Sequence, residues 1–127
     1  MALLIISIMI NLKRLVKSFK YAFKGLLKVF KEEQNLRIQA FFAMIVIVLA
    51  LFFQINRLEW ILLIFVISLV MLMELANSAV ERIADILKPR IDDYVKEIKD
   101  IAAAGVMLSS FVAVIIGLII FFPYIIK

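Results

Sequence analysis

The stretch from Trp60 to Leu87, WILLIFVISLVMLMELANSAVERIADIL, decides how this chain folds. Its first half, up to Met73, is almost continuously apolar, and neither Gly nor Pro interrupts the stretch before Leu87. An apolar run of this kind predicts a membrane-spanning helix, because a helix needs about 20 mainly apolar residues to cross the hydrocarbon core of a bilayer. We therefore expect one helix over residues 60–87 that continues beyond its apolar first half.

The second half of this helix carries a polar face. Helical steps of three and four residues bring its polar residues to one side; they are Glu74, Asn77, Ser78, Glu81 and Asp85. Ionisable groups inside a membrane are costly and point to function. Glu81 and Asp85 could instead form the solvated end of a helix that leaves the bilayer. Glu74 directly follows the apolar run, and that explanation fits it poorly.

Two more apolar runs predict two more spans, so the expected fold is an all-α integral membrane protein forming one domain over residues 1–127. The first span is expected at 38–55 and the third at 101–122, with Asp100 as the N-cap of the third and Pro123 ending it. A charged connection, residues 88–100, precedes the third span. Three spans are few for burying a polar site, which predicts an oligomer. A run of small residues, 102–105 (AAAG), would let helices pack closely.

The N-terminal region, residues 1–37, differs in kind from the spans. Residues 1–11 are apolar but too short to cross the membrane, and they predict a lead-in at the interface. Cations then recur at helical spacing among aromatic and aliphatic residues: Lys13, Lys17, Lys20, Lys24, Lys28 and Lys31. This pattern predicts an amphipathic helix lying in the membrane interface, either as a simple anchor or as part of the site.

Composition narrows the chemistry. Of the 127 residues, 66% are hydrophobic and 20% are charged, and the apolar residues gather in long runs, which excludes a water-soluble enzyme and a disordered chain. The chain has no Cys and no His, which excludes disulfides, Cys/His metal sites and Cys or His nucleophiles. Carboxylates, amides, Lys and Arg remain, and they suit hard cations such as Mg²⁺.

Positive charge is distributed unevenly among the loops. Eight of the Lys and Arg residues precede the first span and four lie in residues 88–100, whereas the short turn before the second span has only Arg57. By the positive-inside rule, the N-terminus and the 88–100 connection are cytoplasmic. The acidic pair Glu32 and Glu33 and the polar face of residues 74–85 then both face the cytoplasm.

A magnesium-nucleotide site is a reasonable expectation there. Glu33 should lie at a depth similar to that of the polar face of residues 74–85, and Mg²⁺ is commonly held by one or two carboxylates together with substrate phosphates. A further carboxylate could act as a base. The three glycines, Gly25, Gly105 and Gly117, are far apart, so no P-loop is present.

The segment ELANSAVERIAD, residues 74–85, resembles the signature E-x-x-N-[ST]-A-[IV]-E-x-x-x-D of the prokaryotic diacylglycerol kinase family. These are small trimeric enzymes of the bacterial inner membrane that include the undecaprenol kinases. The match covers roughly residues 14–120, and further elements of it are Tyr21–Gly25, Glu33 with Arg37, Lys99–Asp100 and Ala103–Val106.

The resemblance implies roles for particular residues. Glu74 matches the general base that takes the proton from the lipid hydroxyl, and Glu33 and Glu81 match the carboxylates that hold Mg²⁺ on the substrate ATP. Further positions match residues that line the nucleotide site: Arg14, Tyr21, Lys24, Asn77, Asp85, Lys99 and Asp100. The implied partners are ATP, a membrane lipid alcohol and two further copies in a homotrimer, with no nucleic acid.

One departure and two alternatives remain. Family members commonly carry a Tyr-His pair where this chain has Ile91-Asp92, which puts the adenine contacts of this loop in doubt. The segments 35–37 and 56–60 look closer to undecaprenol kinases, which predicts undecaprenyl phosphate as the product. Diacylglycerol, giving phosphatidic acid, is the alternative lipid. A cation or proton pathway is the non-enzymatic alternative, although a conduction path would need polar residues through the bilayer depth, which residues 38–53 and 106–122 almost lack.

Overall fold

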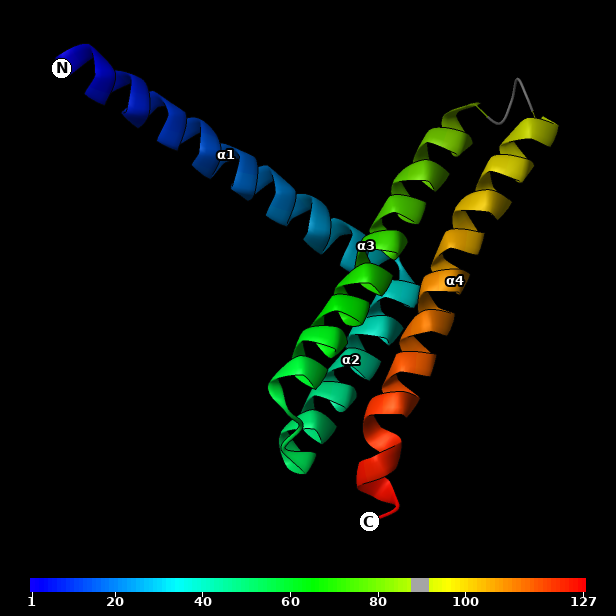
Figure 1. The fold of residues 1–127 in the computed structure, drawn as a ribbon. Coiled ribbons are helices and arrows are strands. Elements are labelled where there is room, and N and C mark those ends of the chain that lie inside the picture. The colour runs from blue at the N-terminus through cyan, green and yellow to red at the C-terminus, as the bar shows by residue number, and fades with distance from the viewer. Residues whose placement is uncertain (88–91) are drawn as a thin grey trace. The chain divides into compact units, whose positions relative to one another are not determined.

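The computed structural model describes residues 1–87 and 92–127, apart from the side chain of Asp92. These residues form four helices and no strand: α1 (Ala2–Glu32), α2 (Gln34–Phe53), α3 (Arg57–Leu87) and α4 (Asp92–Ile125) (Figure 1). The predicted all-α class is confirmed. Residues 88–91 of the predicted charged connection lie outside the described residues, and so does Ile91 of the departure from the family pattern.

The chain divides into two units, residues 1–32 and residues 33–127. The first unit is α1, which is one continuous helix with no fully buried residue. The expected separation of residues 1–11 from the basic helix is therefore wrong, because no Pro or Gly occurs before Gly25 to stop the helix. The interfacial position of α1 stays a prediction.

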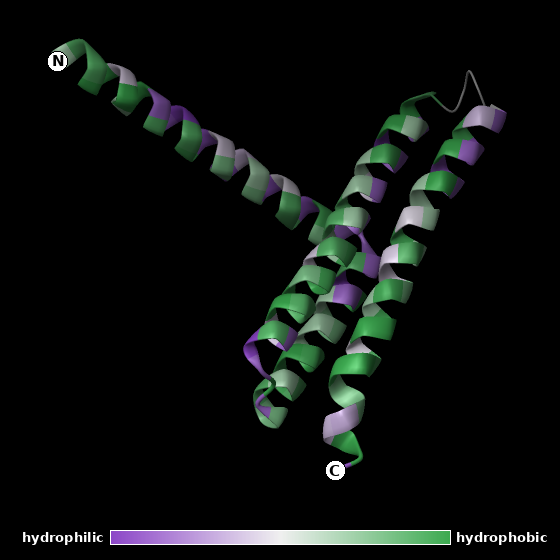
Figure 2. Cartoon of the chain, viewed as in Figure 1, coloured by the Kyte–Doolittle hydropathy of each residue, from purple (hydrophilic) through white to green (hydrophobic). Residues whose placement is uncertain are grey.

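The second unit contains three helices that are long and apolar enough to cross a membrane, namely α2, α3 and α4. Apolar residues run along most of each helix, and polar residues gather toward the ends (Figure 2). The prediction of three spanning helices is confirmed at the level of length and composition. Each helix is longer than the predicted span, and the reasons differ.

The turn between α2 and α3 explains why α3 begins at Arg57 rather than at Trp60. Gln54 ends α2 in the left-handed conformation, with φ 53° and ψ 54°. Asn56 and Glu59 then cap α3 reciprocally: the Glu59 backbone N–H donates to Asn56 Oδ1 at 2.9 Å, and the Asn56 N–H donates to Glu59 Oε1 at 3.0 Å. This is a capping box with Asn at the N-cap, which fixes the first turn of the helix.

The prediction of an N-cap at Asp100 is wrong. α4 begins at Asp92, so Asp100 lies two turns inside the helix. Residues 92–104 contain no Pro or Gly, and Asp93 in the first turn supplies negative charge that stabilises a helix N-terminus. Pro123 also lies inside α4, which continues to Ile125, because a Pro in the last turn removes only one backbone donor.

α3 is the central helix of this unit, since it packs along α4 and also against α2 (Figure 1). Near the α2–α3 turn the three helices share a hydrophobic core made of Ala50, Ile55, Leu63, Ile120 and Phe121. Farther along, Gly105 of α4 lies directly against α3, where an added Cβ would come within 2.5 Å of Met73 Cε. The contact is made by the flexible end of the Met73 side chain, so close helix packing along residues 102–105 stays a prediction.

We expect Gly105→Leu to lower the free energy of unfolding by about 1–3 kcal/mol, because the larger side chain overpacks the α3–α4 contact. Gly117→Ala is the matched control, since no atom lies within 4 Å of its added Cβ, and it should leave stability unchanged or slightly higher. Unfolding of both variants in detergent measures the difference. Equal stability of the two variants would contradict the close contact at Gly105.

Candidate functional site

Glu74 is the centre of the polar face of α3. Its side chain is only 2% exposed, and one carboxylate oxygen, Oε2, accepts a hydrogen bond of 3.1 Å from Gln39 Nε2 on α2. A buried carboxylate is costly unless it is hydrogen-bonded or neutralised. The hydrogen bond from the Gln39 amide therefore offsets part of the free-energy cost of burying Glu74.

Glu33 reaches the same face from outside α3. It is the N-cap residue of α2, with an extended backbone, yet its side chain makes no capping hydrogen bond. Instead, Glu33 Oε1 accepts a hydrogen bond of 3.2 Å from the hydroxyl of Ser78, a residue of α3 that is 1% exposed. The structure thus brings Glu33 to the polar face, as expected.

Three of the predicted site carboxylates lie near one another. Glu33 and Glu81 are both within electrostatic reach of Glu74, and both are half-buried. Like charges gathered at a partly buried site repel one another, so the arrangement favours binding of a cation.

Two buried amide oxygens beside Glu74 have no hydrogen-bond partner within residues 1–87 and 92–127. They are Gln39 Oε1 and Asn77 Oδ1, and Asn77 is 8% exposed. Buried polar atoms are nearly always paired, so unpaired acceptors point to a missing donor, water or cation. Asn77 was predicted as a site residue, and the structure places it one turn from Glu74.

α4 contributes a cation at the edge of this cluster. Lys99 Nζ forms an ion pair of 2.5 Å with Asp85 Oδ1 of α3, and Glu81 also lies within electrostatic reach of Lys99. Asp100, the next residue along α4, is exposed. A partly exposed ion pair adds little stability, about 0–1 kcal/mol, so its placement beside the carboxylates is the more informative property.

The remaining predicted residues lie on α1 and are described within that unit. Tyr21 is exposed, and Lys24 Nζ lies 5.9 Å from the centroid of its ring. The backbone oxygen of Arg14 accepts a hydrogen bond from Ser18 Oγ at 3.0 Å. The grouping of Arg14, Tyr21 and Lys24 with the carboxylates of α3 stays a prediction.

The residues near Glu74 offer only oxygen donors for a metal. The described part of the chain contains no group of three or more acidic side chains close enough to hold an ion by themselves. Glu33, Glu81 and the unpaired Asn77 Oδ1 nevertheless match the oxygen ligands that Mg²⁺ takes when phosphates and water complete its shell. Their role as magnesium ligands stays a prediction.

Sequence reasoning missed Gln39 and assigned no role to Ser78. Gln39 lies inside the apolar run of residues 38–53, and a lone glutamine within a membrane helix is itself a signal of a polar partner. The signal could not identify the partner, because helical periodicity does not tell which face of α3 meets α2.

An all-helical unit with a buried carboxylate at the polar end of its central membrane helix defines a class: small membrane proteins with an acidic site on one side of the bilayer. The model of the prokaryotic diacylglycerol kinase family matches residues 20–121 of the chain. The chain therefore belongs to the prokaryotic diacylglycerol kinase family, and it is a lipid kinase.

Individual relatives agree with this assignment. An undecaprenol kinase of Bacillus subtilis is 30% identical over 113 residues, which cover 89% of this chain and 92% of the relative. A diacylglycerol kinase of Haemophilus influenzae is 37% identical over 113 residues, covering 88% and 96%. A diacylglycerol kinase of Escherichia coli is 29% identical over 102 residues, covering 80% and 84%.

Gln39→Met keeps the side-chain length but removes the donor to Glu74. Because the buried carboxylate loses a hydrogen bond, we expect turnover to fall roughly 10-fold or the free energy of unfolding to fall by about 1–3 kcal/mol. The control is Gln34→Met, an exposed position on the same helix. Phosphate-transfer assays and detergent unfolding of both variants measure these effects. If the two variants behave alike in both measurements, the Gln39–Glu74 contact is unimportant.

Proposed function

We propose that this lipid kinase transfers the γ-phosphoryl group of ATP, supplied with Mg²⁺, to the hydroxyl of undecaprenol at the cytoplasmic face of the bacterial inner membrane. The observation that carries the proposal is Glu74, a carboxylate buried at the polar end of a membrane helix and held by Gln39. The name of the Bacillus subtilis relative, undecaprenol kinase, and its alignment over nearly its whole length support the choice of lipid.

Diacylglycerol is the second candidate substrate. It is favoured by the names of the Haemophilus influenzae and Escherichia coli relatives, diacylglycerol kinases that align with most of this chain. Family membership favours an enzyme over the cation or proton pathway. Phosphate transfer from labelled ATP, with undecaprenol and diacylglycerol offered separately to the purified protein in mixed micelles, decides between the two lipids. Transfer to neither lipid would contradict the proposed function.

In this mechanism Glu74 is the general base. The lipid hydroxyl donates its proton to the carboxylate as the hydroxyl oxygen bonds to the γ-phosphorus, and the bond from that phosphorus to the β-phosphate oxygen breaks to release ADP. Gln39 holds Oε2 of the base, which leaves the other carboxylate oxygen to accept the proton. Much of the catalysis is positioning, so a base fixed between two helices suits the reaction.

The other site residues act on the nucleotide. Glu33 and Glu81 would hold Mg²⁺ on ATP, where the ion would neutralise phosphate charge, and Asn77 Oδ1 would offer a further oxygen. Asp85, Lys99 and Asp100 are proposed to complete the nucleotide site within the second unit. Participation of Arg14, Tyr21 and Lys24 in nucleotide binding stays a prediction from the family resemblance. The proximity of Glu33, Glu81 and Lys99 to the α3 polar face supports this assignment.

The active enzyme is proposed to be a homotrimer with the site assembled between protomers and with α1 lying in the cytoplasmic interface. Most large hydrophobic side chains of α2, α3 and α4 are exposed in the single chain, which leaves surface for contacts between protomers. Lipid tails supply no polar partners, so we propose that a neighbouring protomer completes the polar site. Distribution of Lys and Arg supports the cytoplasmic N-terminus.

Glu74→Gln should lower turnover at least 100-fold, since it removes the base while keeping the shape and the contact to Gln39, and general-base catalysis contributes about 10²–10⁴-fold. The rate is measured by phosphate transfer, and gel filtration checks that the oligomer is intact. Near-normal turnover would mean that another group takes the proton.

Glu33→Gln and Glu81→Gln should raise the Mg²⁺ and ATP concentrations needed for half-maximal rate, because each removes one charge from the metal shell. High Mg²⁺ should partly restore the rate. Glu97→Gln, an exposed carboxylate on α4, is the control. A loss of rate that neither Mg²⁺ nor ATP relieves would assign these two glutamates a structural role.

Mixing inactive Glu74→Gln chains with inactive Glu33→Gln chains should restore no activity, because Glu33 and Glu74 of one chain lie at the same polar face. A mixed trimer would then contain no site with both glutamates intact. Differential tags verify that mixed oligomers form. Verified mixtures that are more active than the separate variants would show that the two glutamates of one site come from different protomers.

A further inference from the structure

We infer that the first three turns of α1, residues 2–12, lie within the hydrocarbon of one bilayer leaflet on every side, whereas the later turns of the helix lie at the membrane surface. This assignment goes beyond the interfacial position proposed for α1 as a whole, and it does not depend on the proposed reaction. The segment precedes residues 20–121, which the family model matches, so family membership does not account for it.

One line of residues along α1 changes character at Lys13. Steps of three and four residues keep positions on one side of a helix, and the six lysines of α1 follow such steps from Lys13 to Lys31. Continued toward the N-terminus, the same steps reach Ile10, Ile6 and Leu3. The side of the helix that carries charge in its later turns is therefore apolar in its first three turns.

The other sides of residues 2–12 are apolar as well. The segment reads ALLIISIMINL, and its polar side chains are Ser7 and Asn11. Its large hydrophobic side chains are all more than half exposed in the structure, from 51% at Ile8 to 84% at Leu3. A helix that is hydrophobic on all sides is stable only where apolar surroundings cover all of it.

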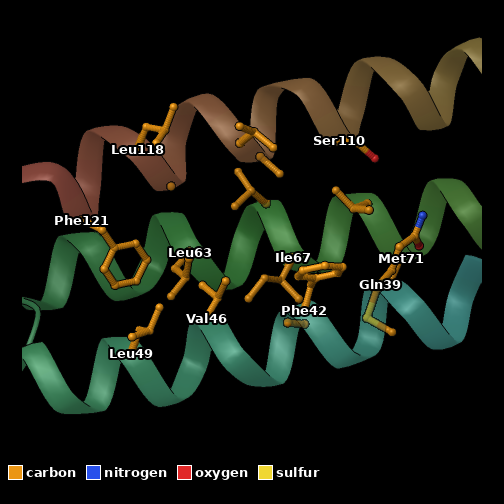
Figure 3. A pocket seen from close by; sticks show the side chains of 16 residues that line it. Gln39, Phe42, Val46, Leu49, Leu63, Ile67, Met71, Ser110, Leu118 and Phe121 are labelled. Atoms are coloured by element: carbon orange, nitrogen blue, oxygen red, sulfur yellow. The ribbon is translucent and has the colours of Figure 1, made fainter.

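The apolar side chains of the second unit differ, because there α2, α3 and α4 cover part of one another. Figure 3 shows side chains from all three helices pointing into a shared cavity of about 460 Å³, which Gln39 also lines. The first unit consists of α1 alone, so no other helix of that unit covers residues 2–12. Their cover has to come from the surroundings of the unit.

The hydrocarbon of the bilayer is the partner that meets this requirement. The helices α2, α3 and α4 are long and apolar enough to span a membrane, so hydrocarbon is available to the chain. Contact with a second copy would cover one side of the segment and leave the opposite side in water.

The length of the segment and the charges after it restrict it to one leaflet. At 1.5 Å per residue, residues 2–12 are about 16 Å long, which is about half of the roughly 30 Å hydrocarbon core. Lys13 and Arg14 directly follow the segment, and cations at the end of an apolar segment stay on the cytoplasmic side. The segment therefore enters the cytoplasmic leaflet and does not cross the bilayer.

A small tilt of α1 satisfies both parts of the helix. The centres of the two parts, near Ser7 and Ala22, are about 22 Å apart along the axis. Lowering the first centre by one helix radius, about 5–6 Å, takes its upper side beneath the headgroups and requires a tilt of about 15° from the membrane plane. The start of the helix then lies only about 8 Å lower than Ala22, so its free backbone N–H groups stay within reach of water and headgroups.

The two polar side chains of the segment are compatible with this position. A Ser hydroxyl can donate to the carbonyl oxygen four residues earlier in its own helix, as Ser18 Oγ does to the backbone oxygen of Arg14 at 3.0 Å. Ser7 has the same option within its own turn of α1. Asn11 comes two residues before Lys13, where the segment reaches the level of the headgroups.

Spin labels on introduced cysteines test the inference directly, since the chain has no Cys of its own. Ile6→Cys and the matched control Lys17→Cys place a nitroxide on the same line of α1, about three turns apart. The full-length protein is reconstituted in vesicles of phosphatidylcholine and phosphatidylglycerol, and EPR measures collisions of the nitroxide with oxygen, which concentrates in hydrocarbon, and with a nickel chelate, which stays in water. The ratio of oxygen to nickel collisions should be at least about 10-fold higher at position 6 than at position 17.

The two reagents also separate the alternatives. High nickel access at both positions would overturn the inference and place α1 flat at the membrane surface. Low access of both oxygen and nickel at position 6 would overturn it as well, because protein would then cover the segment. Ile10→Cys, on the same line of α1, repeats the measurement should Ile6→Cys fail to fold.

Salt distinguishes insertion of the apolar segment from attachment by the lysines alone. Attraction of Lys to anionic headgroups weakens at high ionic strength, whereas contact of apolar side chains with hydrocarbon does not. In vesicles of phosphatidylcholine alone at about 1 M salt, labelled Ile6→Cys should keep its high ratio of oxygen to nickel collisions. A fall of this ratio to the value of Lys17→Cys would overturn the inference. Neither measurement involves phosphate transfer, so this inference and the proposed function can fail separately.

Discussion

Burial of the Glu74 carboxylate is the constraint on which the rest of the second unit depends. A membrane offers no water to solvate such a group, so its partners must come from the protein. Gln39 of α2 is such a partner, and the hydrogen bond requires Gln39 and Glu74 to lie at the same level along their two helices. The turn at Gln54 and the cap at Asn56 set that height: Gln39 is 15 residues before Gln54, and Glu74 is 17 residues after Arg57, which are nearly equal lengths of helix.

Polar contacts are sorted to the two ends of the helices. At the end with the α2–α3 turn, Glu59 accepts a hydrogen bond from the Tyr124 hydroxyl as well as from Asn56. At the other end, Glu33, Glu74 and Lys99 make the contacts of the candidate site. The segment between is apolar, as Figure 2 shows, so the carboxylates are reached from one side only. This separation suits a reaction at one membrane face.

The candidate site breaks local rules that the remainder of the chain obeys. Asn56 caps α3 in the usual way, whereas Glu33 stands at the N-cap of α2 without capping it and bonds to Ser78 instead. Asn77 is buried with an oxygen unpaired, and acidic side chains gather where repulsion opposes them. Proteins break such rules mainly at functional sites, where a ligand supplies the missing partner. The contrast between Asn56 and Glu33 supports the proposal that substrate binds at the end of the helices where Glu33 lies.

The sequence by itself determined the helices and the polar face. Apolar runs are set by the solvent that surrounds them, and helical spacing puts Glu74, Asn77 and Glu81 on one side of α3 whatever it packs against. The sequence predicted helix ends less well. It indicated an N-cap at Asp100, whereas α4 continues through this residue, because a charged segment can continue a helix as readily as interrupt it. Only the tertiary structure decided that Gln39 meets Glu74, that Ser78 meets Glu33, and that a cavity adjoins them. Those facts depend on which faces of different helices come together, and the periodicity of a single helix does not contain that information.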